Sequence, residues 1–140
     1  METRVPRSDR LPRTILLADG NPDCRELLCL YLKLLNYPTP IQAADGEEAV
    51  RKALIEKPDL IIMEIFLPKK DGLEVAAHLR ANPLTRDAMI VAATAMALPD
   101  GRERCLAGGF DGYLAKPFTV RELGSLLETI FSPDASPDRP

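Results

Sequence analysis

Five short apolar runs, alternating with longer amphipathic stretches, constrain the fold of this chain more than any other feature of its sequence. The runs lie at residues 15–18, 39–43, 60–63, 89–93 and 112–115. Apolar runs of this length indicate buried strands, and the stretches between them have the spacing of helices. Strands that alternate with helices form a parallel sheet with helices on both faces. We therefore predict an α/β fold, with the most apolar run, 60–63, at its centre.

Capping and turn residues indicate where the helices begin and end. Asn21-Pro22 begins the first helix, because asparagine caps free N–H groups and proline fits the first helical position. Thr119 and Glu122 form a capping box before the last helix. A helix from about Pro99 should end at Gly108-Gly109. Pro38 precedes the second run and Pro40 lies within it, and because neither can donate to a ladder, the run is expected at or near an edge of the sheet.

The composition favours one soluble domain inside the cell. The chain has 140 residues, of which 46% are hydrophobic and 28% charged, with a net charge of −3. These values predict a globular core and no broad cationic surface for nucleic acid or membranes. The cysteines, Cys24, Cys29 and Cys105, are odd in number and fit neither a disulfide framework nor a zinc pattern. We expect reduced thiols and a cytoplasmic protein.

The two ends of the chain differ in composition from the middle. Residues 1–13 and 132–140 are rich in proline and charge and lack apolar periodicity, so we predict disordered tails there. Residues 14–131 then form the single domain. We expect no output domain, and hence a stand-alone module.

Polar residues follow four of the five predicted strands. Asp19 follows the first, Glu64 the third, Thr94 the fourth and Lys116 the fifth. Each has an ordinary interpretation on its own: a turn residue, a solvated carboxylate, a strand-end cap and a surface charge. In open α/β sheets, however, sites form beyond the carboxyl ends of the strands. Four such residues at matched strand ends therefore predict a functional site.

The order and spacing of these segments closely resemble the receiver domains of response regulators, which act in bacterial two-component signalling. The resemblance covers roughly residues 14–131. It is carried by residues 15–19, 60–64, 93–95 and 113–118, and by the pairs Leu67-Pro68 and Asp71-Gly72. It implies a flavodoxin-like sheet of five parallel strands in the order 2-1-3-4-5.

The resemblance also implies roles for individual residues. An aspartate at the position of Glu64 accepts phosphate from a histidine kinase. Paired acids after the first strand, of which this chain has Asp19, bind Mg²⁺ together with the acceptor and the backbone carbonyl at Phe66. The side chains at Thr94 and Lys116 contact the phosphoryl oxygens. Lys116 and Pro117 are expected to be joined by a cis peptide bond.

In the same family, movement at Thr94 is coupled to the aromatic residue at Tyr113. The coupling alters a surface that the fourth helix, fifth strand and fifth helix form, and here Met96 is expected in the adjoining loop. This surface is the expected binding site for a kinase, a phosphotransfer protein or a downstream effector. Its residues in this sequence would include Arg102, Tyr113, Phe118 and Arg121.

Two residues depart from the family pattern at the reaction centre. Gly20 stands where the second acid of the pair is expected, so Mg²⁺ binding should be weak or absent. Glu64 is longer than aspartate by one methylene, which moves its carboxylate outward by roughly 1.5 Å. A displacement of even about 1 Å can cost on the order of 10²-fold in rate. We therefore predict an atypical receiver that binds partner proteins, is not an enzyme and is not phosphorylated at Glu64.

Two alternatives stay open at this point. The chain is a phosphorylatable response regulator in which glutamate replaces the acceptor aspartate as a phosphomimetic, whether naturally or by design. Or it is a small flavin or nucleotide enzyme on a similar sheet. The loop after the first strand argues against the latter, because it has a single glycine and Pro22 removes an amide that a phosphate cradle would use.

Overall fold

The sheet is the centre of the structure, which is a computed structural model that describes residues 11–95 and 100–131. Its five strands are all parallel and lie in the order β2-β1-β3-β4-β5. The strands are β1 (Ile15–Ala18), β2 (Ile41–Ala43), β3 (Leu60–Met63), β4 (Met89–Thr94) and β5 (Gly112–Ala115). The predicted fold class and strand order are confirmed.

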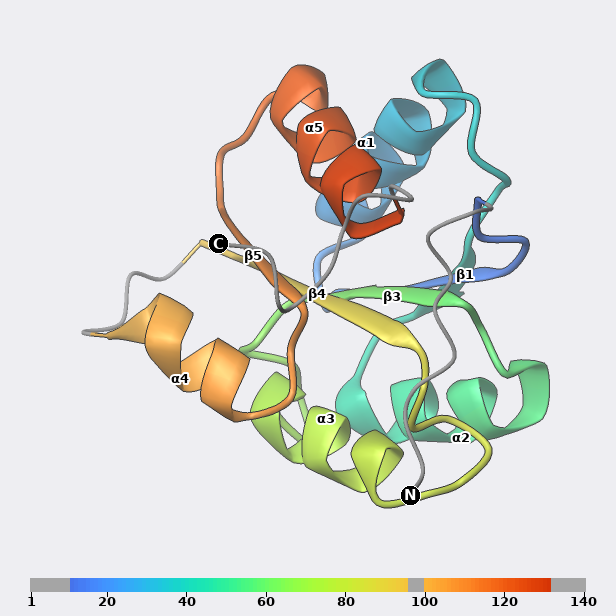
Figure 1. Cartoon of the computed structure of the whole chain (residues 1–140), viewed down its shortest axis with the longest axis vertical. Helices are drawn as coiled ribbons and strands as arrows, with labels where there is room; N and C mark the ends of the chain where they lie inside the picture. Colours follow the sequence, from blue (N-terminus) through green and yellow to red (C-terminus); the bar gives the residue numbers. More distant parts are fainter. Residues whose placement is uncertain (1–10, 96–99, 132–140) are drawn as a thin grey trace.

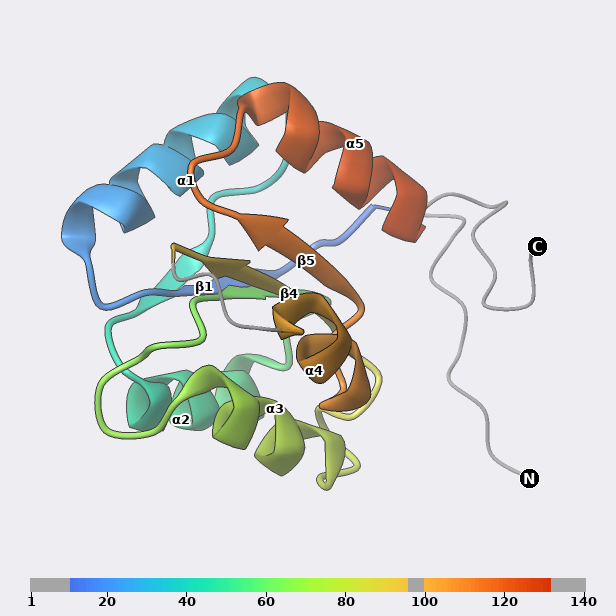
Figure 2. The ribbon, with the colours of Figure 1, turned by 90° about the vertical axis from the view of Figure 1, so that its left-hand side faces the viewer.

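Helices cover both faces of the sheet. They are α1 (Pro22–Leu34), α2 (Gly46–Glu56), α3 (Gly72–Arg80), α4 (Gly101–Ala107) and α5 (Val120–Phe131). Figures 1 and 2 show α1 and α5 side by side on one face and α2, α3 and α4 on the other. None of these helices combines the length and apolarity that crossing a membrane requires.

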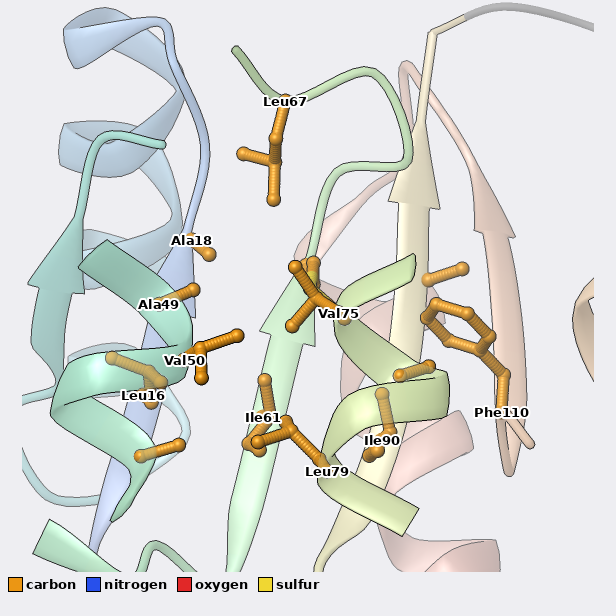
Figure 3. Packing of buried hydrophobic residues seen from close by; sticks show 14 of the residues in the cluster. Leu16, Ala18, Ala49, Val50, Ile61, Leu67, Val75, Leu79, Ile90 and Phe110 are labelled. Atoms are coloured by element: carbon orange, nitrogen blue, oxygen red, sulfur yellow. The ribbon is translucent and has the colours of Figure 1, made fainter. Parts of the chain in front are cut away.

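The strands are apolar on both sides because both faces of the sheet are covered. Alternate residues of a strand point to opposite faces, so neighbours in the sequence enter different cores. Leu16 and Ile61 belong to the core beneath α2 and α3, which also contains Val75 (Figure 3). Ile15 and Ile62 belong to the core beneath α1 and α5. All four strand residues are at most 1% exposed, so β1 and β3 are held from both sides.

The helix ends follow the local signals in the sequence. The Asn21 side chain accepts a hydrogen bond from the N–H of Asp23 at 2.9 Å, and Pro22 is the first residue of α1. Thr119 and Glu122 exchange hydrogen bonds at 2.8 and 3.0 Å at the start of α5. Gly109, with φ of 101°, follows the end of α4 in a conformation that favours glycine.

Three expectations about boundaries had different outcomes. Strand β2 is shorter than predicted and begins at Ile41, since Pro40 has no N–H to give to a ladder. Helix α4 begins at Gly101, and its expected start at Pro99 lies outside the described residues. The predicted disordered tails lie outside them too, except for residues 11–13, and stay predictions.

Candidate functional site

The four polar residues that end the strands meet at the carboxyl edge of the sheet. Backbone pairing continues one residue past the strands and sets their register. The N–H of Glu64 donates to the carbonyl of Ala18 at 2.9 Å, and that of Lys116 donates to the carbonyl of Thr94 at 2.8 Å. Asp19, directly after Ala18, is thereby placed beside Glu64. The order of strands thus brings together residues that are far apart in the sequence.

Lys116 lies between two carboxylates. Its Nζ donates to Oδ2 of Asp19 at 2.5 Å and to Oε1 of Glu64 at 3.1 Å. The site is largely shielded from water, because Asp19 is 4% and Glu64 8% exposed and the Lys116 side chain is 14% exposed. Charges removed from water attract one another more strongly, so this is a buried ionic cluster rather than a surface salt bridge.

The Glu64 carboxylate accepts further hydrogen bonds. Oε2 accepts from the N–H of Phe66 at 3.2 Å, and Oε1 accepts from the N–H of Ala95 at 3.4 Å. The Thr94 hydroxyl, 1% exposed, also hydrogen-bonds to this carboxylate. Together with Lys116, donors from three different strand ends therefore converge on one side chain.

The surroundings stabilise both charges. Burial raises the pKa of Glu64, but the hydrogen bonds from Thr94 and Phe66 and the ammonium of Lys116 outweigh it, so the pKa lies below its ordinary value of 4.5. Burial lowers the pKa of Lys116, but Asp19 and then Glu64 outweigh burial, and the pKa lies above its ordinary 10.5. Glu64 is therefore a carboxylate and Lys116 an ammonium at neutral pH.

The loop after β1 holds Asp19 in place. Its Oδ1 accepts from the N–H of Asn21 at 2.9 Å, and its backbone carbonyl accepts from Nη1 of Arg25 at 2.6 Å. The Nε of Arg25 donates to Gln42 of β2 at 3.0 Å, which ties the loop to the edge strand. The sequence analysis missed Arg25, because a lone arginine near the start of a helix has no distinguishing pattern.

Gly20 leaves little room beside Asp19. A Cβ atom added to Gly20 would lie 3.1 Å from Cδ and 3.3 Å from Cγ of Pro68, and 3.5 Å from the carbonyl oxygen of Ala44. The two contacts to Pro68 are tight, so the proline ring would have to shift by a few tenths of an ångström, whereas the distance to Ala44 is an ordinary van der Waals contact. A side chain at this position therefore requires Pro68 to move.

The residues present do not fit Mg²⁺ as they stand. Such an ion prefers six oxygens in octahedral geometry, with carboxylates among them. Both oxygens of Asp19 and both of Glu64 already accept hydrogen bonds, and the Lys116 ammonium lies between the two carboxylates. Gly20 adds no ligand. Within residues 11–95 and 100–131, no group of three or more acidic, histidine or cysteine side chains could hold a metal.

The residues expected at the partner-binding surface do not all lie together. Tyr113 is partly buried against the core that includes Cys105 of α4. Phe118 packs instead against Tyr31 of α1, with ring centroids 6.1 Å apart and planes at 64°, on the other face of the sheet. Arg102 and Arg121 are exposed.

Two further expectations concern the segments next to the site. The peptide bond between Lys116 and Pro117 is cis. Met96, expected beside the partner-binding surface, lies outside the described residues.

Comparison with known proteins agrees with the geometry. Residues 15–128 match the family described as the response regulator receiver domain. The transcriptional regulatory protein PdtaR of Mycobacterium tuberculosis is 35% identical over 122 residues, which are 87% of this chain and 58% of that protein. The phosphate regulon transcriptional regulatory protein PhoB of Escherichia coli is 32% identical over 86% of this chain and 52% of its own length. The chain thus spans about half the length of these relatives.

Solved structures agree as well. One is the receiver domain of the sensor histidine kinase PA1611 from Pseudomonas aeruginosa, which has a magnesium ion coordinated in its active site cleft. It is 38% identical, with a TM-score of 0.77, and the match covers 85% of this chain and 97% of that one.

Proposed function

This chain belongs to the response regulator receiver domain family of two-component signalling, and on that premise we propose that it is an atypical receiver that signals by binding a partner protein. In this proposal Glu64 stands at the acceptor position and does not take up phosphate. The domain has no enzymatic activity of its own and needs no cofactor. It acts in the cytoplasm, in keeping with its three free cysteines.

The hydrogen bonding of Glu64 carries the proposal. Its carboxylate already receives Lys116 and Thr94, which by family resemblance would bind an incoming phosphoryl group, and also the N–H groups of Phe66 and Ala95. Phosphoryl transfer depends on positioned donors and charge neutralisation. Because the glutamate side chain occupies those donors itself, they are not free to stabilise a transferring phosphoryl group.

Glu64 imitates a phosphorylated aspartate only in part. A carboxylate has one negative charge and two oxygens, whereas a phosphoryl group brings roughly −1.5 to −2 and three acceptor oxygens. The imitation holds Thr94 and Lys116 toward the acceptor but lacks the full charge. We propose a receiver that phosphate does not switch, rather than one locked in a fully active state.

Partner binding is assigned to the surface formed by α4, β5 and α5, with Arg102, Tyr113 and Arg121 as its principal residues. The two arginines are exposed, and Tyr113 lies between them in the sequence on the outermost strand of the sheet. The partner is a histidine kinase, a phosphotransfer protein or a downstream effector. Phe118 is a weaker candidate, because its ring packs against Tyr31.

Phosphorylation by a small-molecule donor tests the proposal. The natural chain, Glu64→Asp, Gly20→Asp and the double variant are each incubated with Mg²⁺ and acetyl phosphate, and the intact mass is measured. We expect an adduct of one phosphoryl group, labile to base, only in the double variant. It regains both the shorter acceptor and the second acid, whose Cβ requires the Pro68 ring to shift by a few tenths of an ångström.

The other outcomes are equally informative. If Glu64→Asp alone becomes phosphorylated, Gly20 is tolerated and the alternative of a phosphorylatable regulator with a substituted acceptor is favoured. A stoichiometric phosphoryl adduct on the natural chain would refute the proposal outright. Colour or a nucleotide that co-purifies with the chain would instead support the flavin or nucleotide enzyme.

A binding experiment tests the partner surface. Once a partner protein is identified, Arg102→Ala and Arg121→Ala are expected to weaken its binding. The matched control is Arg51→Ala on α2, whose side chain is 62% exposed and lies away from this surface. Equal effects of all three substitutions would show that general charge, and not this surface, accounts for the binding.

A further inference from the structure

Helix α1 has leucines on two opposite sides. Leu28 and Leu32 pack into the core and are 3% and 0% exposed. Leu27, Leu30 and Leu34 point outward and are 48%, 50% and 62% exposed. Spacings of three and four place these outer leucines in one row along the helix. This leucine row lies on the outer layer of the molecule, where α1 has α5 beside it (Figure 2).

Two opposite charges flank the leucine row. Glu26 and Lys33 are exposed and, being seven residues apart, lie on the same side of the helix next to Leu30. Along the helix they are separated by about 10.5 Å, which is too far for them to pair with each other. Neither takes part in an ion pair within the described part of the chain. One flank of the leucine row therefore carries a negative charge at Glu26, near its N-terminal end, and a positive charge at Lys33, near its C-terminal end.

We propose that the leucine row is the interface of a weak symmetric dimer, with α1 packed antiparallel against α1 of a second copy. A two-fold axis at the level of Leu30 brings Leu30 opposite Leu30 of the second copy, and Leu27 opposite Leu34 to within about one residue or 1.5 Å along the helix. The same axis brings Glu26 opposite Lys33 of the second copy, within about one residue or 1.5 Å along the helix. One symmetry operation thus matches leucines with leucines and opposite charges with each other, twice in every dimer.

The charge pattern points to a second copy as the occupant. When two copies of the helix pack antiparallel about a two-fold axis, Glu26 of each copy faces Lys33 of the other, so the charged flank is complementary to the same flank of a second copy. The dimer should be weak, because three half-exposed leucines per copy can bury only a small part of the roughly 800 Å² that each partner buries in a stable interface. We expect a monomer at low concentration and a dimer at high concentration. This inference is independent of the state of Glu64.

Sedimentation velocity over a concentration series tests the proposal. Between about 10 µM and about 1 mM, the natural chain should shift from monomer toward dimer. Leu30→Gln should raise the dissociation constant by about tenfold or more, since both copies lose the contact. Ile55→Gln is the matched control, because Ile55 is 68% exposed but lies on α2, on the other face of the sheet. Circular dichroism melting verifies that both variants fold.

A charge swap tests the antiparallel arrangement. Lys33→Glu alone places two glutamates opposite each other at both ends and should weaken the dimer. Glu26→Lys combined with Lys33→Glu restores complementarity and should recover it. A chain that stays monomeric at about 1 mM would overturn the proposal, even if the leucine row bound a different protein. A dimer that ignores Leu30→Gln and the charge reversals would overturn it as well.

Discussion

Removal of the buried ammonium in Lys116→Met tests the electrostatic description of the site. Methionine has a similar length and no charge, so the substitution removes the donor to Asp19 and Glu64 with little change in volume. The two carboxylates, 4% and 8% exposed, then face each other without a cation. Removing one partner of a buried ion pair costs about 3–5 kcal/mol, and we expect a loss of that size.

Lys69→Met is the matched control. The Nζ of Lys69 lies 3.6 Å from Oδ2 of Asp45, but the side chain is 60% exposed. An exposed pair of this kind contributes about 0–1 kcal/mol, so the control should lose little stability. Unfolding in urea, followed by circular dichroism because the chain has no tryptophan, gives both values.

The pH dependence distinguishes an electrostatic effect from a loss of packing. In the natural chain the folded-state pKa of Glu64 is lowered, so its stabilising contribution is complete above the unfolded value of 4.5 and is lost as pH falls through the folded value. Without Lys116, the attraction and the hydrogen bond of the ammonium are lost, so the pKa of Glu64 should rise, while the hydrogen bonds from Thr94 and Phe66 continue to lower it. The variant should then gain stability relative to the natural chain as pH falls toward and below the unfolded value of 4.5, because its Glu64 takes up a proton at a higher pH than Glu64 of the natural chain.

Two results would refute this reasoning. One is a loss in Lys116→Met no larger than in Lys69→Met, which would mean that water screens the site. The other is a large loss with the same pH dependence as the natural chain, which would mean that packing rather than charge accounts for it.

Two further substitutions test the scaffold. Arg80→Ala removes hydrogen bonds from the guanidinium to the carbonyl of Gly109 at 3.0 and 2.8 Å and to Asp111 at 2.8 Å. These bonds join α3 to the loop before β5, so we expect the free energy of unfolding in urea to fall by about 2–4 kcal/mol. Asp71→Ala removes one half of the capping box that Asp71 and Glu74 form at the start of α3, and should cost about 0.5–2 kcal/mol in the same assay.

The fold could be predicted because its signals are local. Each strand is a short apolar run, and residues such as Asn21 and Thr119 cap helices through hydrogen bonds to neighbours two or three positions away. The positions of Asp19, Glu64, Thr94 and Lys116 at the carboxyl edge also followed, because the ends of parallel strands meet at one edge of the sheet. The start of β2 was predicted less well. The strand is only weakly apolar, and the sequence around Pro40 does not indicate at which residue its pairing with β1 begins.

The partners within the site could not be predicted with the same certainty. Phe66 was singled out for its backbone carbonyl, yet in the structure its N–H donates to Glu64. The N–H of Ala95 and the guanidinium of Arg25 were not expected to take part at all. Every residue has a backbone N–H, so no residue type indicates which of these groups will face a carboxylate.

By itself, the sequence determined the alternation of strands and helices and the residues at the strand ends, among them Glu64 after the third strand and Gly20 beside Asp19. Only the tertiary structure decided that Lys116 lies between Asp19 and Glu64, which are 97 and 52 residues away along the chain. It also decided that α1 leaves a row of leucines outside the core. The physical reason is the same for both: such contacts depend on strand register and helix packing, to which residues across the whole chain contribute.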